Sequence, residues 1–236
     1  MTVGEIIKAV RWCIDEEAVN AADLADASAY DFDGGTHTDT GLMNNIIRNK
    51  IGAALRWVCL YAPAEQLSGG GSGSDTAIDI IKETTGSPSG QLIALDAAFV
   101  RLIRVKGENW HRAIMGESVL REDSGEYLQL RDENGATATL DRPQAALINT
   151  KIKSVEVWPT EGAGNFTVTY VVTPSASSLS NLDNDSTVIG IPPMVETSFV
   201  YYLAFLLLSA YGDARAKSMY DIAVLNLGKK EDTQRQ

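Results

Sequence analysis

The 236-residue sequence has little cysteine, little histidine and few positive charges, and each shortage argues against a class of protein. Its two cysteines, Cys13 and Cys59, are too few and too far apart for a disulfide framework or a zinc site, which indicates a reducing compartment. The 20 basic residues against 31 acidic ones give a net charge of −11. The whole molecule therefore lacks long-range attraction to phosphate, and a free-standing DNA-wrapping protein is disfavoured.

The sequence also lacks a long apolar run. The most apolar segment, residues 199–208, is well short of the roughly 20 residues that cross a bilayer, and it is expected to form a buried helix. Residues 1–10 contain Glu5 and no apolar core followed by a small-residue cleavage site, so no secretory signal is expected. We therefore predict no membrane partner.

Residues typical of catalytic or metal sites are scarce. Neither histidine, His37 or His111, has a nucleophile close to it in the sequence. Residues 31–42 resemble a calcium-binding loop, but the sixth position is not glycine and the twelfth is not glutamate. The glycine-rich run at residues 69–74 lacks the Gly-Lys-Ser/Thr ending of a phosphate-binding loop. The sequence predicts no enzyme, no metal ion and no cofactor.

The first helix is predicted to begin at Thr2, because Thr2 and Glu5 have the spacing of a capping box. Its apolar stripe consists of Val3, Ile6, Ile7, Val10, Cys13 and Ile14. Trp12 points nearly opposite to this stripe and needs another cover. Loops of the same chain and a neighbouring subunit are equally good candidates for that cover, since tryptophan is enriched at interfaces.

Three further helices are predicted, at residues 40–61, 194–211 and 214–227. The strand-like runs between them lie at residues 91–96, 99–106, 109–115, 126–131, 136–141, 151–158 and 165–173. Asn134 and Gly135 predict a two-residue hairpin turn, because both central positions of a type I′ turn need positive φ.

These patterns predict an α+β fold. The helices at the two chain ends can bury their apolar stripes against each other only if the ends meet. Residues 1–66 and 191–236 are therefore predicted to form one helical bundle, interrupted by a β-domain at residues 75–190. Strands at this spacing are typical of an antiparallel sandwich or small barrel. Residues 228–236 are predicted to be a flexible tail.

The layout of the chain resembles that of the head–tail adaptor proteins of short-tailed bacteriophages, also called neck, tail-tubular or portal-adaptor ring proteins. The shared features are a short amphipathic helix, an Asp-containing loop, a longer helix ending near Pro63, a β insertion and a C-terminal helical pair. The motif that carries the resemblance lies between Pro192 and Tyr220. It reads Pro-x-Met-Val-Glu-Thr-x-Phe-Val-Tyr-Tyr-Leu-Ala and runs into Tyr-Gly-Asp-Ala-Arg-Ala-Lys-x-Met-Tyr.

The resemblance implies a virion protein, assembled in the cytoplasm of the bacterial host, that forms a homo-oligomeric ring. Such rings are usually dodecamers docked beneath the portal protein, and they extend the DNA channel and carry further tail proteins. In this family the C-terminal segment commonly reaches into the portal, a role that here would go to Lys229, Lys230 and Arg235. Genomic DNA would pass through without sequence-specific binding, which suits an acidic channel wall.

A closed ring uses two different faces of each subunit. Trp12 and three residues of the apolar C-terminal helix, Phe199, Tyr202 and Phe205, are the candidates for this interface. The alternative function is a monomeric carbohydrate- or receptor-binding module of a virion or cell surface. Its predicted ligand platform consists of aromatic residues on strands, namely Trp110, Tyr127, Trp158 and Tyr170.

Overall fold

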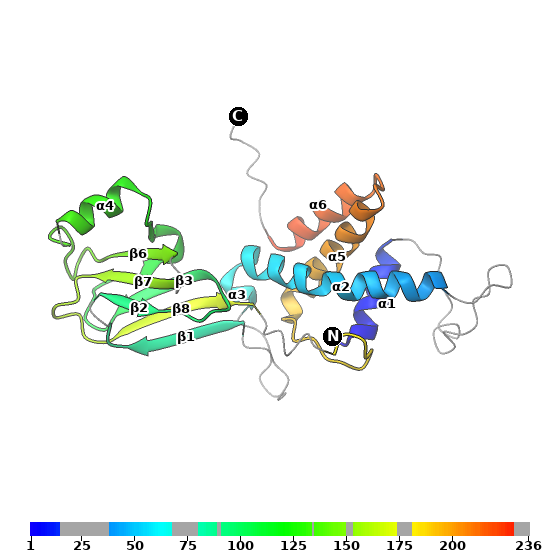
Figure 1. Ribbon diagram of the computed structural model, residues 1–236, viewed down its shortest axis with the longest axis horizontal. Helices are drawn as coiled ribbons and strands as arrows, with labels where there is room; N and C mark the ends of the chain where they lie inside the picture. The colour runs from blue at the N-terminus through cyan, green and yellow to red at the C-terminus, as the bar shows by residue number, and fades with distance from the viewer. Residues whose placement is uncertain are drawn as a thin grey trace. The chain divides into compact units, whose positions relative to one another are not determined.

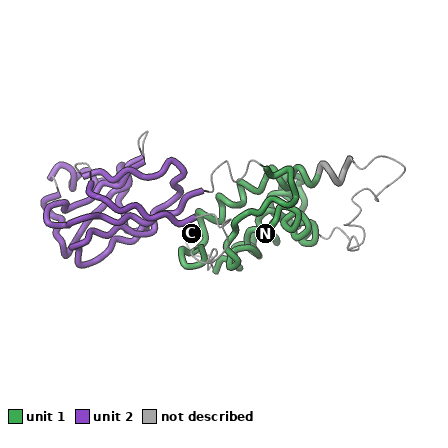
Figure 2. The backbone as a smooth tube through the Cα atoms, turned by 90° about the horizontal axis from the view of Figure 1, so that it is seen from below, with its two compact units in different colours: residues 1–78, 174–236 green, residues 79–173 purple. Residues whose placement is uncertain are grey.

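A computed structural model describes residues 1–14, 38–67, 80–88, 91–133, 135–149, 153–173 and 181–228. The chain divides into two compact units, coloured separately in Figure 2. Unit 1 comprises Met1–Ile78 and Pro174–Gln236, and unit 2 comprises Asp79–Thr173.

Unit 1 begins with helix α1, Val3–Cys13, and the predicted capping box is present. The Glu5 N–H donates to the Thr2 hydroxyl at 3.2 Å, and the Thr2 N–H donates to the Glu5 carboxylate at 2.7 Å. The apolar stripe of α1 is buried at Val3, Ile6, Ile7 and Val10. The start of the helix is tied to a distant segment, because the Val3 N–H donates to the Thr187 carbonyl at 2.9 Å.

The capping box makes the stability of unit 1 dependent on pH. The hydrogen bond from the Thr2 backbone is the main reason why the pKa of Glu5 lies below its ordinary value. The ionised carboxylate therefore stabilises the fold above its unfolded-state pKa, and this contribution is lost as the pH falls through the folded-state pKa. We expect Glu5→Gln to lower stability at neutral pH and to flatten its dependence on acid pH, measured by urea denaturation at several pH values. Asp221→Asn, at an exposed position of the same unit, is the control; equal effects of the two variants would contradict the assignment.

Helix α2, Thr38–Tyr61, and the single turn α3, Ala64–Leu67, follow. The inward face of α2 is buried at Ile47, Ile51, Ala54, Leu55, Val58 and Cys59. Arg48 extends from α2 to the segment before the C-terminal helices, where its guanidinium pairs with Asp185 at 2.6 Å.

The core helix of unit 1 is α5, Glu196–Ala210, which is preceded by a 3-10 turn at Pro193–Val195. It packs against α1, α2 and the last helix, α6, Ala216–Asn226 (Figure 1). By length and composition Pro193–Ala210 is also long and apolar enough to span a membrane. Phe199, Leu203 and Leu207 are nevertheless buried inside unit 1, as expected for a core helix.

Unit 2 contains two four-stranded sheets, ordered β1-β8-β3-β4 and β2-β7-β6-β5 (Figure 1). The strands are β1 (Ile81–Gly86), β2 (Leu92–Ala94), β3 (Phe99–Gly107), β4 (Ile114–Met115), β5 (Leu120–Arg121), β6 (Gln144–Asn149), β7 (Lys153–Trp158) and β8 (Phe166–Val172). All pairs are antiparallel except β5 with β6, which is parallel. Residues of both sheets share one apolar core, so the sheets form a sandwich.

Trp110 and Phe166 lie in the middle of this core. Their rings meet edge to face with centroids 5.1 Å apart, and both side chains are almost completely buried. The Trp110 indole N–H donates to the Pro159 carbonyl at 3.3 Å, which satisfies its polar atom inside the sandwich. The predicted α+β fold is thus confirmed, with terminal helices that pack together and a β insertion between them.

Three predicted strands differ in the structure: residues 136–141 form no strand, residues 109–115 form one only at Ile114–Met115, and residues 126–131 belong to helix α4, Gly125–Asp132. Ser124 caps this helix by accepting the Tyr127 N–H at 3.1 Å. Tyr127 and Leu130, three positions apart, are then buried together against Trp158. This helical spacing outweighs the local strand-like composition.

The predicted hairpin at Asn134 and Gly135 is also wrong. Asn134 lies outside the described residues, but Gly135 has φ +73° and its N–H donates to the Leu130 carbonyl at 2.8 Å. Gly135 therefore terminates α4, the usual role of a left-handed glycine at the end of a helix. The described residues 136–141 form turns and loop instead of the predicted strand.

Candidate interaction surfaces

Titratable side chains do not gather into a site in the described part of the chain. No group of three or more His, Cys, Asp or Glu residues there is placed to hold a metal ion. His111 forms an exposed pair with Asp141, and His37 lies outside the described residues. The apolar and aromatic surfaces of the molecule are therefore the places to look for function.

Trp12 is one of the most exposed large hydrophobic side chains, with 73% of its surface open to solvent. It lies on α1 opposite the buried stripe of Val3, Ile6 and Val10, as its helical position predicts. The described residues of the same chain leave it uncovered. A second subunit is then a suitable cover, because burying an indole at an interface gains a large apolar area at little entropic cost.

A second aromatic feature is formed by side chains from three helices of unit 1. Trp57 and Tyr61 come from α2, Tyr202 and Phe205 from α5, and Tyr220 from α6; we call these five residues the aromatic surface. The Trp57 and Tyr202 rings stack with centroids 4.1 Å apart and an angle of 7° between their planes. Phe205 and Tyr220 lie 5.2 Å apart, and Tyr202 and Phe205 5.3 Å apart.

Burial is graded across the aromatic surface. Trp57 forms its buried base, Tyr202 and Phe205 are half-buried, and Tyr61 and Tyr220 are exposed at 45% and 39%. Burial is also the main cause that raises the pKa of the Tyr202 phenol, so this residue is neutral at physiological pH. The result is an uncharged patch with apolar ring faces, the composition that is enriched at the centre of protein interfaces.

Helix α6 adds to this exposed apolar area. Ala216 and Ala223 are its buried residues, and small side chains there let α6 approach α5 closely. Leu225, on the same helix, is 74% exposed. An eleven-residue helix that shows this much apolar side chain to solvent is expected to have a partner.

The predicted interface residues therefore differ in their positions. Tyr202 and Phe205 lie in the aromatic surface and Trp12 is exposed, whereas Phe199 is completely buried in the core of unit 1. No local pattern in the sequence predicts the grouping of Trp57, Tyr61 and Tyr220, because it depends on helices that are far apart in the sequence. Lys229, Lys230 and Arg235 lie outside the described residues.

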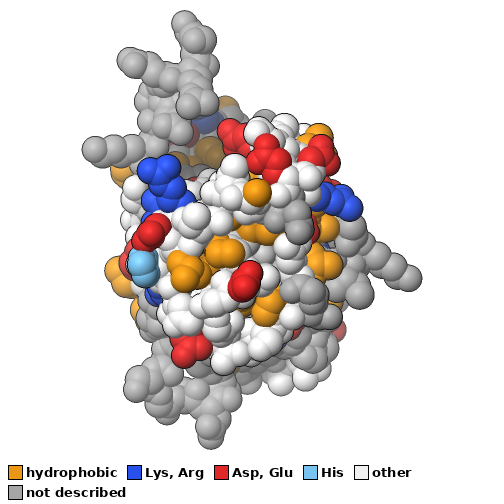
Figure 3. Space-filling view, turned by 90° about the vertical axis from the view of Figure 1, so that its left-hand side faces the viewer, with side chains coloured by type: hydrophobic (Ala, Val, Ile, Leu, Met, Phe, Trp, Pro, Cys, Tyr) orange, Lys and Arg blue, Asp and Glu red, His pale blue; other side chains and the backbone are white. Residues whose placement is uncertain are grey.

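Unit 2 does not present the aromatic ligand platform that the alternative function needs. Trp110, Tyr127, Trp158 and Tyr170 are each at most 4% exposed, so they belong to the core. The face drawn in Figure 3 carries hydrophobic side chains, with both acidic and basic ones between them.

The sequence matches the family model described as SU10 adaptor protein over residues 1–235. A search of curated proteins finds no match. The match includes both the helical unit and the inserted sandwich, and it confirms the resemblance to phage adaptors. The chain therefore belongs to the SU10 adaptor protein family, a phage head–tail adaptor family whose members have a structural, non-enzymatic role in the virion.

Proposed function

We propose that this protein forms a ring below the portal, joins the capsid to the tail and extends the channel through which the DNA leaves. The observation that carries the proposal is the family match over residues 1–235, which spans both units. The proposed partners are the portal protein and the tail proteins that follow, and the proposed ring is a dodecamer assembled in the host cytoplasm. Lys229, Lys230 and Arg235 are proposed to contact the portal.

The exposed features of unit 1 support a heterologous interface, in which one face of each subunit contacts a different face of the next. Trp12 lies on α1, whereas the aromatic surface is formed by α2, α5 and α6, so the two features are different patches of one subunit. We propose that Trp12 of one subunit packs on the Tyr202, Phe205 and Tyr220 rings of the next. Aromatic pairs contribute about 0.5–1.5 kcal/mol beyond the area that they bury.

The charge of the chain supports passage of DNA without binding. With 31 acidic and 20 basic residues, a ring of this protein is strongly negative. Each basic contact to a phosphate would hold the duplex and slow its passage, whereas an acidic wall repels it. The proposed channel therefore has no sequence-specific contact with DNA.

Co-assembly with the portal protein tests this function. We expect the purified adaptor, mixed with portal rings, to form a complex whose mass corresponds to the portal plus a full adaptor ring. Native mass spectrometry gives the mass, and electron microscopy gives the position of the ring. An adaptor that stays monomeric with the portal present would contradict the proposal.

The proposed subunit interface predicts a specific loss of assembly. Trp12→Ala is expected to raise the protein concentration needed for half-assembly at least tenfold, equivalent to about 1.4 kcal/mol per contact. Its melting temperature stays close to that of the wild type, because Trp12 is exposed in the subunit. Met194→Ala, at a 63% exposed apolar position of the same unit, is the matched control and is expected to assemble normally. Normal assembly of Trp12→Ala would show that Trp12 is not at the interface.

A further inference from the structure

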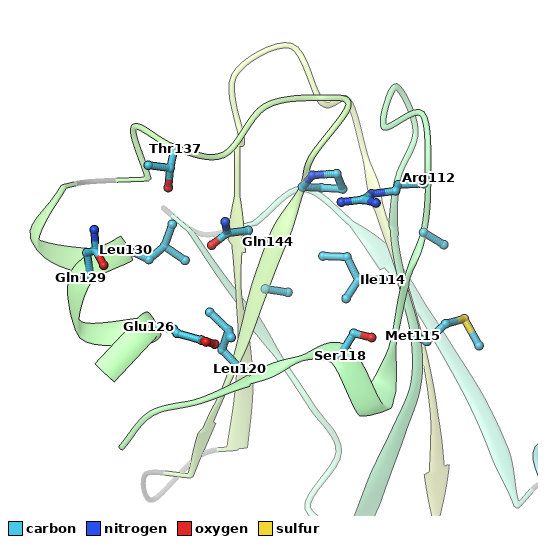
Figure 4. A pocket seen from close by; sticks show the side chains of 13 residues that line it. Arg112, Ile114, Met115, Ser118, Leu120, Glu126, Gln129, Leu130, Thr137 and Gln144 are labelled. Atoms are coloured by element: carbon cyan, nitrogen blue, oxygen red, sulfur yellow. The ribbon is translucent and has the colours of Figure 1, made fainter. Parts of the chain in front are cut away.

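A pocket of about 590 Å³ opens on the side of the sandwich in unit 2 (Figure 4). Its walls come from both sheets and from α4: residues 112–115 line it on the β4 side, residues 143–145 at the start of β6, and Glu126, Gln129 and Leu130 on α4. A volume of this size lies within the range of binding sites for small ligands and short segments of chain. None of the roles proposed above uses it.

Two strand edges face this pocket. β4 is the last strand of its sheet and pairs with β3 alone, so within the described residues its other side has no strand partner. β5 pairs with β6 only at Ala146 and Leu147, which leaves the outer side of Gln144 and Ala145 without a strand in the described part of the chain. In a strand, alternate residues direct N–H and C=O to opposite sides. The pocket therefore offers main-chain hydrogen-bonding groups as well as side chains.

The side chains of the pocket combine an apolar base with two opposite charges. Ile114, Leu130 and Ala145 are buried and form the base. Arg112 enters from the β4 side and Glu126 from α4 on the opposite wall (Figure 4). Neither forms a hydrogen bond or ion pair with another described residue, so both charges are available to a ligand.

We propose that this pocket binds an extended peptide segment of a tail protein, which adds a strand to the edge of β4. Free strand edges recognise an extended main chain, and the pockets beside them select its alternate side chains. The segment carries an acidic residue that pairs with Arg112, an apolar residue that packs on Ile114 and Leu130, and a basic residue that faces Glu126. The inference rests on the proposed function, because that function supplies tail proteins as partners.

The arrangement favours a peptide over a small anion or a nucleotide. A phosphate group would pair with the Arg112 guanidinium alone, because the Glu126 carboxylate lies on the opposite wall and attracts only a positive group. A peptide pairs with both charges. Its main chain also bonds to the main-chain groups of β4, whereas a small anion or a nucleotide has no need of these groups. Alternate side chains of an extended chain lie about 6.6 Å apart on the same side, so one segment can present both an acidic and a basic side chain to this pocket.

Peptide binding to the full-length adaptor tests the inference. The probes are overlapping twelve-residue peptides that cover the tail protein of the same phage, with blocked ends and a fluorescent label, together with peptides from the adaptor itself. We expect at least one tail peptide to bind and to slow amide hydrogen exchange in β4, at whichever of Ile114 and Met115 directs its N–H away from β3. Arg112→Glu is expected to weaken that peptide at least tenfold, and exchanging the acidic residue of the peptide for lysine is expected to restore binding to this variant.

Two further variants separate the pocket from the rest of the fold. Thr137→Trp fills the pocket from an exposed position and is expected to abolish binding, whereas Arg142→Glu, an exposed arginine outside the pocket, is expected to change affinity less than twofold. The inference is overturned if no tail peptide binds, if Arg112→Glu and Thr137→Trp bind like the wild type, or if only adaptor peptides bind, which would indicate a contact between copies. Ring assembly with the portal is measured on the same samples. If the wild-type protein does not assemble with the portal, that result counts against the proposed function and not against peptide binding in the pocket.

Discussion

Replacing Phe199 with alanine is expected to lower the free energy of unfolding of unit 1 by about 3–5 kcal/mol. Phe199 is 0% exposed on α5, the helix that packs against α1, α2 and α6. Truncation would leave a ring-sized cavity among side chains that are held from three directions, so the surroundings cannot relax to fill it. The expected defect is therefore in the folding of the subunit and only secondarily in its assembly.

Phe205→Ala is the matched control, because it removes the same side chain from the same helix. Phe205 is half-buried and lies in the aromatic surface, with its ring 5.2 Å from Tyr220. We expect a loss of less than about 2 kcal/mol in the subunit and a larger effect on assembly. Urea denaturation followed by circular dichroism measures the first, and native mass spectrometry measures the second. If Phe199→Ala folds normally but fails to assemble, Phe199 acts at a subunit contact and its place in the core does not explain its role.

Gly135→Val is expected to destabilise unit 2 by about 3 kcal/mol. A side chain at φ +73° costs roughly 1–2 kcal/mol, because a Cβ atom in the left-handed region crowds the following carbonyl. A Cβ atom at this position would also clash with Cδ1 of Trp158, a buried ring that has little room to move. Forcing the ring aside adds roughly 1–3 kcal/mol.

Substitutions at two other glycines separate the backbone strain from the clash with Trp158. Gly162 has φ +70°, but the nearest atom to its added Cβ is 4.0 Å away, so Gly162→Ala reports the backbone strain alone. Gly125→Ala meets nothing within 4 Å at the start of α4 and is expected to be neutral or slightly stabilising. Thermal unfolding of the three variants gives the order, with Gly135→Val the least stable. A Gly135→Val protein as stable as Gly162→Ala would show that Trp158 yields without cost. Because Gly135 terminates α4, one wall of the pocket, its valine variant is also expected to bind peptide more weakly.

Local sequence signals predict the structure correctly where all the interacting groups lie within one segment of the chain. The capping box of α1 depends on Thr2 and Glu5, three residues apart, and the exposure of Trp12 follows from its place on the helix opposite the stripe. The burial of α5 follows from its nearly continuous apolar composition. In these cases the interacting groups lie within one or two helical turns, so their spacing along the chain gives their geometry.

The same signals failed where distant packing decided the structure. Residues 126–131 have a composition that suits a strand, but burial of Tyr127 and Leu130 beside Trp158, about 30 positions later in the chain, favours a helix. The residues predicted for the subunit interface lie in two different environments, the core and the surface, for a similar reason. Phe199 and Phe205 are both aromatic residues of one apolar helix, and only the arrangement of its neighbours places the first in the core and the second in a half-exposed patch.

The sequence alone thus determined the α+β class, the helices with their buried stripes, the acidic charge and the family, because these depend on composition, local spacing and a motif carried by one segment. Only the tertiary structure brought Trp57, Tyr202 and Tyr220 into one surface, and only it placed the edge of β4 opposite α4 to form the pocket. The physical reason is the distance along the chain. A patch or pocket is made by side chains from separate elements, and their meeting depends on how those elements pack and not on their order in the sequence.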